Sequence, residues 1–414
     1  MNTIRLFKSD VYLKESTAVI TSIKSLDNKT LLTFDRTIFF PVGGGQTCDT
    51  GTLTGKAEGS RTFNISDVYE YEDEILHEAD DFDGSLAEGD EVILRLDWAR
   101  RFDNMQRHCG EHILSGVFFE LFGGVNRGFH MGDEYMTVDI SLEAKPEFTA
   151  ITWEMAKEAE LMTNNVIWQN LPVVTTHFDT REEAEKQPLR KALALEKDIT
   201  IVRIGDPEKP ADAVACCGTH PSHSGQVGML KIYKVEPNKG MFRIYFEAGE
   251  RAYKQYQQRF DILTELERDL SAGYADLLEK YNTRKEKTSA LRDRLYHLSK
   301  ATVAKEIEEI KKELSTSKYA DTIFVKEYDY LTIDDLLEIA KGLEGEIPKI
   351  VFLVHADTCT ALMLSDTLDC GKLIKENASV YEGKGGGRKT NARAIFPNHE
   401  NLMMFTDAIE KLTR

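Results

Sequence analysis

Two histidines one helical turn apart place the strongest limit on how this chain can fold. His108 and His112 stand in a stretch where apolar and small residues recur at helical spacing: Phe102, Met105, Cys109, Ile113 and Gly116. Residues i and i+4 of a helix lie on one face, so both imidazoles can reach a single ion. The apolar stripe would hold that helix against a core. We therefore predict a buried helix that presents a pair of histidines.

A cysteine and a third histidine follow much later in the chain. Cys216 and His220 belong to the block Cys-Cys-Gly-Thr-His, in which the glycine favours a turn. A thiolate and imidazoles are ligands that suit zinc in a tetrahedral site. The sequence therefore predicts one Zn2+ per chain, bound by His108, His112, Cys216 and His220. The alternative is a pair of core histidines with an unrelated cysteine pair.

Length and composition are those of an ordinary globular protein. At 414 residues, with 41% hydrophobic and 29% charged residues, the chain can build about two to three domains. No apolar run approaches the roughly 18 residues of a membrane helix, and the N-terminus lacks the apolar segment of a signal peptide. The six cysteines form no disulfide framework and fit a reducing compartment. We expect a cytoplasmic protein without a membrane partner.

The charge is strongly negative overall but unevenly distributed. A net charge of -18 argues against indiscriminate binding of nucleic acid, because an acidic surface repels phosphates. Residues 281–300 nevertheless carry six basic and two acidic side chains, and Lys384, Arg388 and Lys389 stand in a segment without acidic residues. We predict that 383–389 is a loop whose amides and cations could hold phosphate oxygens, with a flexible glycine turn as the alternative.

The order of short β-rich stretches, mixed elements and long helical repeats predicts an α+β protein in four parts. Residues 1–95 are predicted as a small β-barrel-like domain and 96–250 as an α+β zinc-binding core. Residues 251–315 have one glycine, no proline and leucines at helical spacing, which indicates a helical hairpin or a coiled coil. Residues 316–414 are predicted as a C-terminal α/β domain. Local predictions are a turn at Asp27–Asn28, helices over Pro146–Trp168 and Arg181–Leu195, and a strand over Asp321–Val325.

A run of three glycines lies near the N-terminus, within Thr37–Gln46 and shortly before Asp49. Consecutive glycines allow positive φ and a close approach of the backbone to another segment or to a ligand. The run lacks the Gly-Lys-Ser/Thr ending of a nucleotide-binding P-loop. It is therefore predicted to be either a rigid, hydrogen-bonding loop at a site or an ordinary turn.

Taken in order, four blocks resemble the editing half of alanyl-tRNA synthetase and the long form of the free-standing alanyl-tRNA editing proteins. The blocks are Phe40-Pro-Val-Gly-Gly-Gly-Gln46 with Asp49 and Gly51, the pair His108 and His112, Cys216-Cys-Gly-Thr-His220 with Ser224-Gly-Gln-Val-Gly228, and Gly383-Lys-Gly-Gly-Gly-Arg388. The resemblance covers essentially the whole chain and includes no counterpart of the synthetase's ATP-binding catalytic domain. It implies a hydrolase that acts in trans on tRNA(Ala) mischarged with serine or glycine and that does not charge tRNA.

The same resemblance implies roles for individual residues and a homodimer formed through the helical and C-terminal regions. The residues that would contact substrate are Thr37, Gly43, Gly44, Gly45 and Gln46. Those that would take part in catalysis are Thr37, Gln46, His108 and His112. Those that would hold tRNA are Lys384, Arg388 and Lys389.

Two short stretches depart from the family pattern. Cys217 stands where the family usually has the first glycine of Cys-Gly-Gly-Thr-His, so a second thiol lies beside the predicted ligand Cys216. Cys109, Gly110 and Glu111 stand where the family commonly has threonine, alanine and a variable residue. Neither departure removes a predicted metal ligand.

The predicted ligand set leaves the role of the metal open. Zinc could polarise the ester carbonyl, orient the amine of the substrate or activate a water molecule. Four protein ligands close a tetrahedral site, whereas catalytic zinc usually keeps one position open. Either a ligand such as His220 yields to water or substrate, or the metal organises the pocket. Discrimination of serine from alanine requires a hydrogen bond to the seryl hydroxyl, which is the contact implied for Thr37.

Two other functions are compatible with these residues. His108, Glu111 and His112 match the H-x-x-E-H pattern of inverted zinc proteases, for which Glu182 or Glu183 would supply a third ligand. That function leaves the Cys-Cys-Gly-Thr-His block and both glycine runs without a role. The other is a tRNA-binding protein that holds a structural zinc and performs no catalysis.

Overall fold

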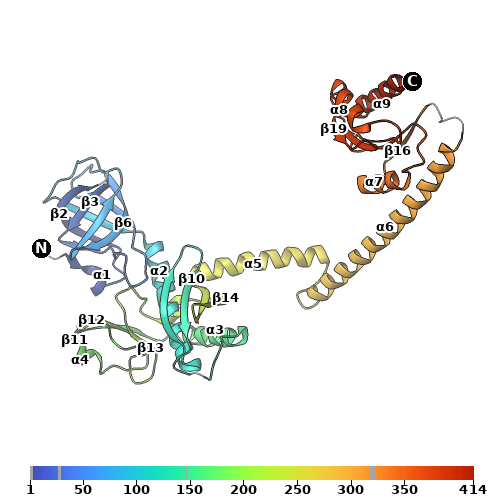
Figure 1. Ribbon diagram of the computed structural model, residues 1–414. Coiled ribbons are helices and arrows are strands. Elements are labelled where there is room, and N and C mark those ends of the chain that lie inside the picture. Colours follow the sequence, from blue (N-terminus) through green and yellow to red (C-terminus); the bar gives the residue numbers. More distant parts are fainter. Residues whose placement is uncertain (1–2, 27–28, 146, 317–321) are drawn as a thin grey trace. The chain divides into compact units, whose positions relative to one another are not determined.

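A computed structural model describes residues 3–26, 29–145, 147–316 and 322–414 (Figure 1). The chain divides into two compact units, Met1–Thr264 and Glu265–Arg414. Helices and strands are mixed in both, as the sequence predicts. The predicted turn at Asp27–Asn28, and the predicted starts of a helix at Pro146 and of a strand at Asp321, lie outside the described residues.

Six antiparallel strands close a barrel in the first unit, so the predicted barrel-like β structure is present, while the division of the chain into four domains stays a prediction. Burial alternates along the strands, so that side chains such as Leu53, Phe63 and Val92 fill the interior. In barrel order the strands are β2 (Glu15–Leu26), β3 (Lys29–Phe34), β7 (Glu74–Ala79), β6 (Thr62–Tyr71), β5 (Gly51–Gly55) and β8 (Glu91–Leu96). The short elements β1 (Ile4–Arg5), α1 (Leu6–Ser9) and β4 (Arg36–Thr37) lie next to it in sequence.

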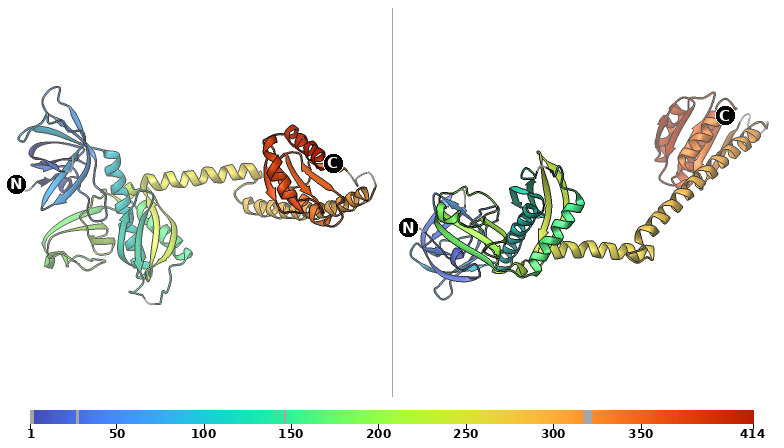
Figure 2. Two further views of the ribbon diagram at one scale, coloured as in Figure 1. Left: turned by 45° about the horizontal axis from the view of Figure 1, so that its top comes forward. Right: turned by 90° about the horizontal axis from the view of Figure 1, so that it is seen from below.

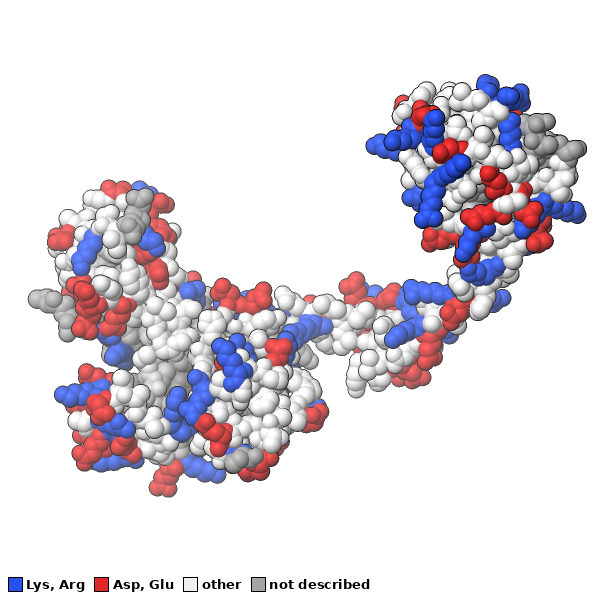
Figure 3. All heavy atoms as spheres, viewed as in Figure 1, with Lys and Arg blue, Asp and Glu red and all other residues white. Residues whose placement is uncertain are grey.

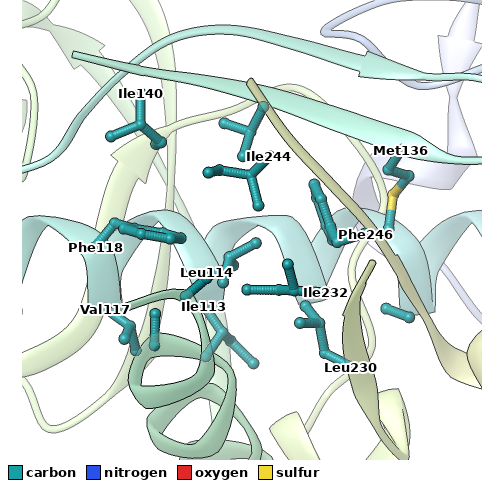
Figure 4. Close-up of a cluster of buried hydrophobic side chains, with 14 of the residues drawn as sticks. Ile113, Leu114, Val117, Phe118, Met136, Ile140, Leu230, Ile232, Ile244 and Phe246 are labelled. Atoms are coloured by element: carbon teal, nitrogen blue, oxygen red, sulfur yellow. The ribbon is translucent and has the colours of Figure 1, made fainter. Parts of the chain in front are cut away.

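The histidine pair lies on a long buried helix, α2 (Trp98–Phe122), as predicted. Asp97 caps its start by accepting a hydrogen bond from the Arg100 amide, and Gly123 ends it with a φ of 62°. Helix α2 packs its apolar side chains against a four-stranded sheet (Figure 4), whose order is β14 (Leu230–Asn238), β15 (Met241–Ala248), β10 (Met136–Ser141) and β9 (Val125–Met131).

Helix α3 (Trp153–Trp168) completes this core with Ala156, Ala159 and Ile167. It begins at Trp153, later than predicted, because the Thr152 side chain caps it by accepting from the Met155 amide.

A three-stranded sheet carries the chain to the Cys-Cys-Gly-Thr-His block. Its order is β11 (Val173–Thr180), β12 (Lys197–Gly205) and β13 (Pro210–Ala215), and η1 (Ser224–Val227) follows the block. The predicted helix over Arg181–Leu195 is wrong beyond its first turn, because α4 spans only Arg181–Ala184. Pro188 has no amide hydrogen to donate and its ring clashes with a helical backbone, which explains the early end.

Long helices occupy the region predicted as a helical hairpin or coiled coil: α5 (Gly249–Leu270) and α6 (Leu277–Leu314). The C-terminal unit contains a five-stranded sheet in the order β16 (Ile323–Tyr328), β17 (Ile350–His355), β18 (Thr360–Leu364), β20 (Asn391–Ile395) and β19 (Lys384–Gly387). Figure 2 shows this sheet in orange and red.

Both faces of the C-terminal sheet are covered. The end of α6 and α7 (Ile333–Gly342) pack on one face, and α8 (Cys370–Asn377) and α9 (His399–Thr413) pack on the other, with η3 (Ala378–Tyr381) after α8. The stretch 383–389 is not the predicted loop throughout, because Lys384–Gly387 forms the edge strand β19. None of the described helices is long and apolar enough to cross a membrane.

Candidate metal centre

Four side chains from distant parts of the sequence meet beside α2. The candidate ligand atoms of His108, His112, Cys216 and His220 all lie within 4.8 Å of one another. Cys216 Sγ is 3.5 Å from His108 Nε2 and 3.4 Å from His220 Nε2. The three histidines are buried and Cys216 is half-buried. The structure thus brings together the residues for which the sequence predicts a shared ion.

The spacing of these atoms fits a tetrahedral zinc ion. Zinc binds imidazole nitrogen at about 2.0–2.1 Å and thiolate sulfur at about 2.3 Å, which places nitrogen and sulfur about 3.6 Å apart in a tetrahedron. The two observed distances from Cys216 Sγ, 3.5 and 3.4 Å, are close to that value. Burial raises the pKa of the Cys216 thiol, but His108, His112 and His220 together lower it well below its usual value. The thiolate, which is the metal-binding form, is therefore favoured.

Gln46 orients His108 from the barrel side. Its Oε1 accepts hydrogen bonds from His108 Nδ1 at 2.9 Å and from the Thr219 amide at 3.0 Å, and its Nε2 donates to Thr219 Oγ1 at 2.8 Å. Because Nδ1 carries the proton, the lone pair of His108 Nε2 faces the cysteine. Gln46, predicted as a substrate and catalytic residue, is buried and positions a candidate ligand.

Asp212 orients His112 as Gln46 orients His108, a role that was not predicted from the sequence. His112 Nδ1 donates to Asp212 Oδ2 at 3.1 Å, and Arg190 donates to both oxygens of the same carboxylate. Burial raises the pKa of Asp212, but Arg190 and His112 outweigh it and the pKa is lowered. The sequence contains one signal for this residue: Asp212 lies on β13 four positions before Cys216, which directly follows that strand, and an even spacing along extended chain places both side chains on one face.

A glycine in α2 allows that contact. A Cβ on Gly116 would lie 2.1 Å from the carbonyl oxygen of Ala211, so only glycine lets the helix approach β13 this closely. His112 stands one turn before Gly116 and faces Asp212 of the same strand.

The glycine run Gly43–Gly45 forms a tight turn at the edge of the site. Gly43 and Gln46 exchange backbone hydrogen bonds of 3.1 and 3.0 Å, and Gly44 and Gly45 have φ of 59° and 81°. Positive φ at both central residues defines a type I′ turn, which glycine adopts without strain. The turn places the Gln46 side chain within hydrogen-bond distance of His108.

A buried ion pair fixes the segment that carries this turn. Arg101 on α2 is fully buried and donates to both oxygens of Asp49 and to the carbonyl oxygens of Ile38 and Val11. Asp49 Oδ2 also accepts from the Phe40 amide at 2.6 Å. With its donors and acceptors paired, this pair ties the barrel to the start of the histidine helix.

A cavity of about 480 Å3 opens onto three of the four candidate ligands. His108, His112 and Cys216 line it with Glu111 and Arg190, and Gly44 and Gly45 border it. The lining cations with exposed side chains are Lys8, Arg127 and Lys191. Gly43 and Gln46 are not part of the lining among the described residues.

Thr37, on β4, is fully buried and does not line this cavity. Burial lowers the pKa of His77 to about 4, so its ring is neutral. His77 Nδ1 donates to the Leu32 carbonyl, and its Nε2 accepts from the Thr37 hydroxyl at 2.8 Å. The contact implied between Thr37 and a seryl hydroxyl stays a prediction.

Other candidate residues lie apart from this centre. Glu182 and Glu183 are exposed on α4 and do not belong to the group of metal-type side chains around His108. In the C-terminal unit, Lys384, Arg388 and Lys389 are exposed. Lys389 lines a shallow cavity of about 660 Å3, whose other lining residues are Asp369, Gly371, Lys372, Lys375, Glu376, Gly386 and Gly387.

Comparison with known proteins identifies the family. The chain is 30% identical to the alanyl-tRNA editing protein AlaX-L of Pyrococcus horikoshii over 420 residues, which cover 99% of this chain and 98% of that protein. The chain belongs to the alanyl-tRNA editing protein family. The resemblance inferred from the four sequence blocks is thereby confirmed.

The editing family shares this region with longer enzymes. Alanine–tRNA ligases of Ignicoccus hospitalis and Pyrococcus abyssi are 28% and 29% identical over 99% of this chain, which spans 43% and 44% of their lengths. Residues 7–100 match a family of class II (A) tRNA synthetases, and 199–245 match the second additional domain of threonyl- and alanyl-tRNA synthetases. The second match contains Cys216 and His220, whereas His108 and His112 lie between the two matched segments.

Proposed function

We propose that this chain is a trans-acting hydrolase that deacylates tRNA(Ala) mischarged with serine or glycine. It would cleave the ester between the amino acid and the ribose, with zinc as cofactor and without aminoacylation activity. The observation that carries this proposal is a cluster of three histidines and a cysteine, of which His108, His112 and Cys216 line one cavity, in a chain of the alanyl-tRNA editing family. We place the protein in the cytoplasm, where tRNA is charged.

The ligand set supports a zinc ion held by His108, His112, Cys216 and His220. When bound, zinc would supply a Lewis acid for the ester carbonyl. Gln46 accepts a hydrogen bond from His108 Nδ1, and Asp212 accepts one from His112 Nδ1. The Nε2 atoms of both histidines would therefore face the ion. The buried ligands and the turn at Gly44 and Gly45 limit the access of bulk water to one side of the site.

Serine selectivity is assigned to Thr37 in this proposal. Its hydroxyl donates to His77 and accepts from the Phe39 amide, so a seryl hydroxyl that reached it would replace one of these partners. A site that hydrogen-bonds a substrate hydroxyl rejects the analogue without it, because its own polar group is then left unpaired. The alanyl ester, which has no hydroxyl, would therefore be hydrolysed less efficiently than the seryl ester.

The cations would hold the tRNA at two places. Lys8, Arg127 and Lys191 line the catalytic cavity, where the 3′ end would enter. In the C-terminal unit, Lys384, Arg388 and Lys389 would contact phosphates, and Figure 3 shows basic side chains standing out on the visible face of that unit. These cations supply the local positive charge that a chain with a net charge of -18 otherwise lacks.

A homodimer is proposed through the helical and C-terminal regions. Large apolar side chains are exposed along both long helices, and a second copy would remove them from water. On α5 they are Tyr253, Tyr256, Phe260, Ile262, Leu263 and Leu266, and on α6 they are Leu278, Tyr281, Leu291, Leu295, Tyr296 and Leu298.

One observation favours a different function, a tRNA-binding protein with a structural zinc. Three histidines and one cysteine supply all four ligands of a tetrahedral ion, as structural sites do.

A deacylation assay distinguishes the proposed hydrolase from a tRNA-binding protein with a structural zinc. Purified protein is incubated with Ser-tRNA(Ala) and with Ala-tRNA(Ala), with and without a chelator. Our proposal requires loss of serine, retention of alanine and inhibition by the chelator. Stable Ser-tRNA(Ala) in the presence of zinc-loaded protein would contradict it.

A further inference from the structure

Glu111 is a buried carboxylate at the metal centre that the proposed zinc site does not use. It follows His108 by three residues, so these two side chains are neighbours on the surface of α2. Its side chain lines the cavity and is 4% exposed. It is not one of the four residues whose ligand atoms cluster. Because a buried charge is costly without a partner, its placement requires an explanation.

One oxygen of Glu111 is held and the other is free. Oε1 accepts from the Ser115 hydroxyl and from Asn126 Nδ2 at 2.7 Å, and Asn126 Nδ2 also lies 3.1 Å from Ser115 Oγ. These bonds from α2 and β9 fix the plane of the carboxylate. Within the described part of the chain, Oε2 has no hydrogen-bond partner. It is thus available to a group that enters the cavity.

Among the described residues, no cationic side chain forms an ion pair or a hydrogen bond with Glu111. Arg190 lines the same cavity, but its guanidinium is committed to Asp212. Lys8, Arg127 and Lys191 have exposed side chains, and Arg127 pairs with Glu143. The other carboxylate of the lining, Asp198, is exposed and lies 3.8 Å from His177. Glu111 is therefore the buried anion available to a cationic ligand in the described lining.

An aminoacyl ester brings such a cation to this position. The carbon next to its ester carbonyl carries an ammonium group, which is positively charged at neutral pH. When the carbonyl lies at the ligand cluster, the ammonium, which is two bonds away from the carbonyl carbon, would lie in the same cavity, and Glu111 lines that cavity together with His108 and His112. We propose that Glu111 Oε2 binds the α-ammonium of the esterified amino acid and thereby orients the ester.

This assignment rests on the proposed deacylase function and defines its substrate class. Esters of amino acids with a free α-amine would be accepted, and esters whose amine is acylated, such as peptidyl esters, would be rejected. Glu111 also has a structural role, because its Oε1 binds Ser115 of α2 and Asn126 of β9. The proposed substrate contact is separate from that role, because it uses Oε2.

The test pairs one variant with one change in the substrate. Glu111→Gln keeps an oxygen for Ser115 and Asn126 and replaces Oε2 with an amide that cannot attract a cation. Ser-tRNA(Ala) is treated with nitrous acid, which exchanges the α-amine for a hydroxyl. The kcat/KM of wild type and variant is measured on both esters, so that the ratio of variant to wild type cancels the different reactivity of the two esters. Asp198→Asn is the matched control.

We expect Glu111→Gln to lose roughly 10- to 100-fold on the seryl ester, as for a charge-assisted hydrogen bond, and less than about threefold on the deaminated ester. Asp198→Asn should affect both esters alike. A defect in folding or zinc content lowers both rates equally, so the ratio remains informative. Equal loss on both esters, or no loss on either, would overturn the assignment of Glu111. An inactive wild-type protein would instead contradict the proposed function itself.

Discussion

The two runs of three glycines have the same composition and opposite structures. Gly43–Gly45 turns back on itself with positive φ at Gly44 and Gly45, and a Cβ on Gly45 would lie 2.7 Å from Phe129 Cδ1. Gly385–Gly387 is extended and exposed at the edge of the C-terminal sheet. There, a Cβ on Gly386 would meet no described atom within 4 Å.

The difference teaches that the neighbours of a glycine run decide its role. In the first run Gly44 and Gly45 are exposed, but the run lies against Phe129 and is followed directly by Gln46, so it serves to place a side chain at the candidate metal centre. The second run is held by β20 on one side only and is flanked by Lys384 and Arg388. An open edge flanked by cations suits a large anionic ligand.

The largest expected effect is the loss of zinc and of hydrolysis when ligands near the first glycine run are removed. The double variant His108→Ala/Cys216→Ala removes two candidate ligands near the first run. Zinc should fall below stoichiometry, and kcat/KM on Ser-tRNA(Ala) should fall by about a thousandfold, since a Lewis acid contributes several kcal/mol. Affinity for uncharged tRNA should stay unchanged. Metal analysis that still finds one zinc per chain would contradict the assignment of His108 and Cys216 as zinc ligands.

The role of the first run in placing Gln46 is tested next. Gln46→Ala leaves His108 Nδ1 and the Thr219 amide without their acceptor, and zinc affinity should fall by about 10- to 100-fold. Thr47→Ala is the control, because the Thr47 hydroxyl donates to Asn104 and touches no candidate ligand. Competition with a chelator measures both. Equal zinc affinities in the two variants would show that Gln46 has no part in the metal centre.

Thr37 lies just before the first run and tests whether that region also selects the substrate. Thr37→Val keeps the shape and removes the hydroxyl, so the preference for Ser-tRNA(Ala) over Ala-tRNA(Ala) should narrow by roughly 1–3 kcal/mol. The readout is the ratio of the two kcat/KM values. An unchanged ratio, with a lower free energy of unfolding, would restrict Thr37 to its bond with His77.

The second run should affect binding and leave chemistry intact. Replacing Lys384, Arg388 and Lys389 by alanine should raise KM and leave kcat nearly unchanged, because the metal-type residues lie in the other unit. The slope of log Kd against log salt should fall by about two to three, the value for three lost phosphate contacts. Lys411→Ala, an exposed cation on α9, is the control. A fall in kcat with an unchanged salt slope would contradict this division.

The smallest effect is a direct comparison of the glycines. Gly45→Ala should lower the free energy of unfolding of the first unit by about 1–3 kcal/mol, because its φ is 81° and Phe129 blocks a Cβ. Gly386→Ala should stay within about 0.5 kcal/mol of wild type. Tryptophan fluorescence reports the first unit, since Trp98, Trp153 and Trp168 all lie there, and circular dichroism follows both. Equal destabilisation by the two variants would remove the contrast.

Local patterns were sufficient for much of the fold. The helix around His108 and His112 follows from apolar spacing and from caps at Asp97 and Gly123, all of which are local. The barrel follows from alternating strands. The helix predicted over Arg181–Leu195 failed because a helical apolar pattern outweighed the break at Pro188. The loop predicted at the second glycine run failed because pairing with β20 provides hydrogen bonds that composition does not reveal.

The sequence by itself determined the kinds of group available: three imidazoles, a thiolate and two glycine runs, in an order that identifies the family. Only the tertiary structure decided which of them meet. It joined Gln46 to His108, Asp212 to His112 and Thr37 to His77, and it left Oε2 of Glu111 facing a cavity. The physical reason is that spacing along the chain encodes local geometry, whereas contacts between distant segments depend on how helices and sheets pack against one another.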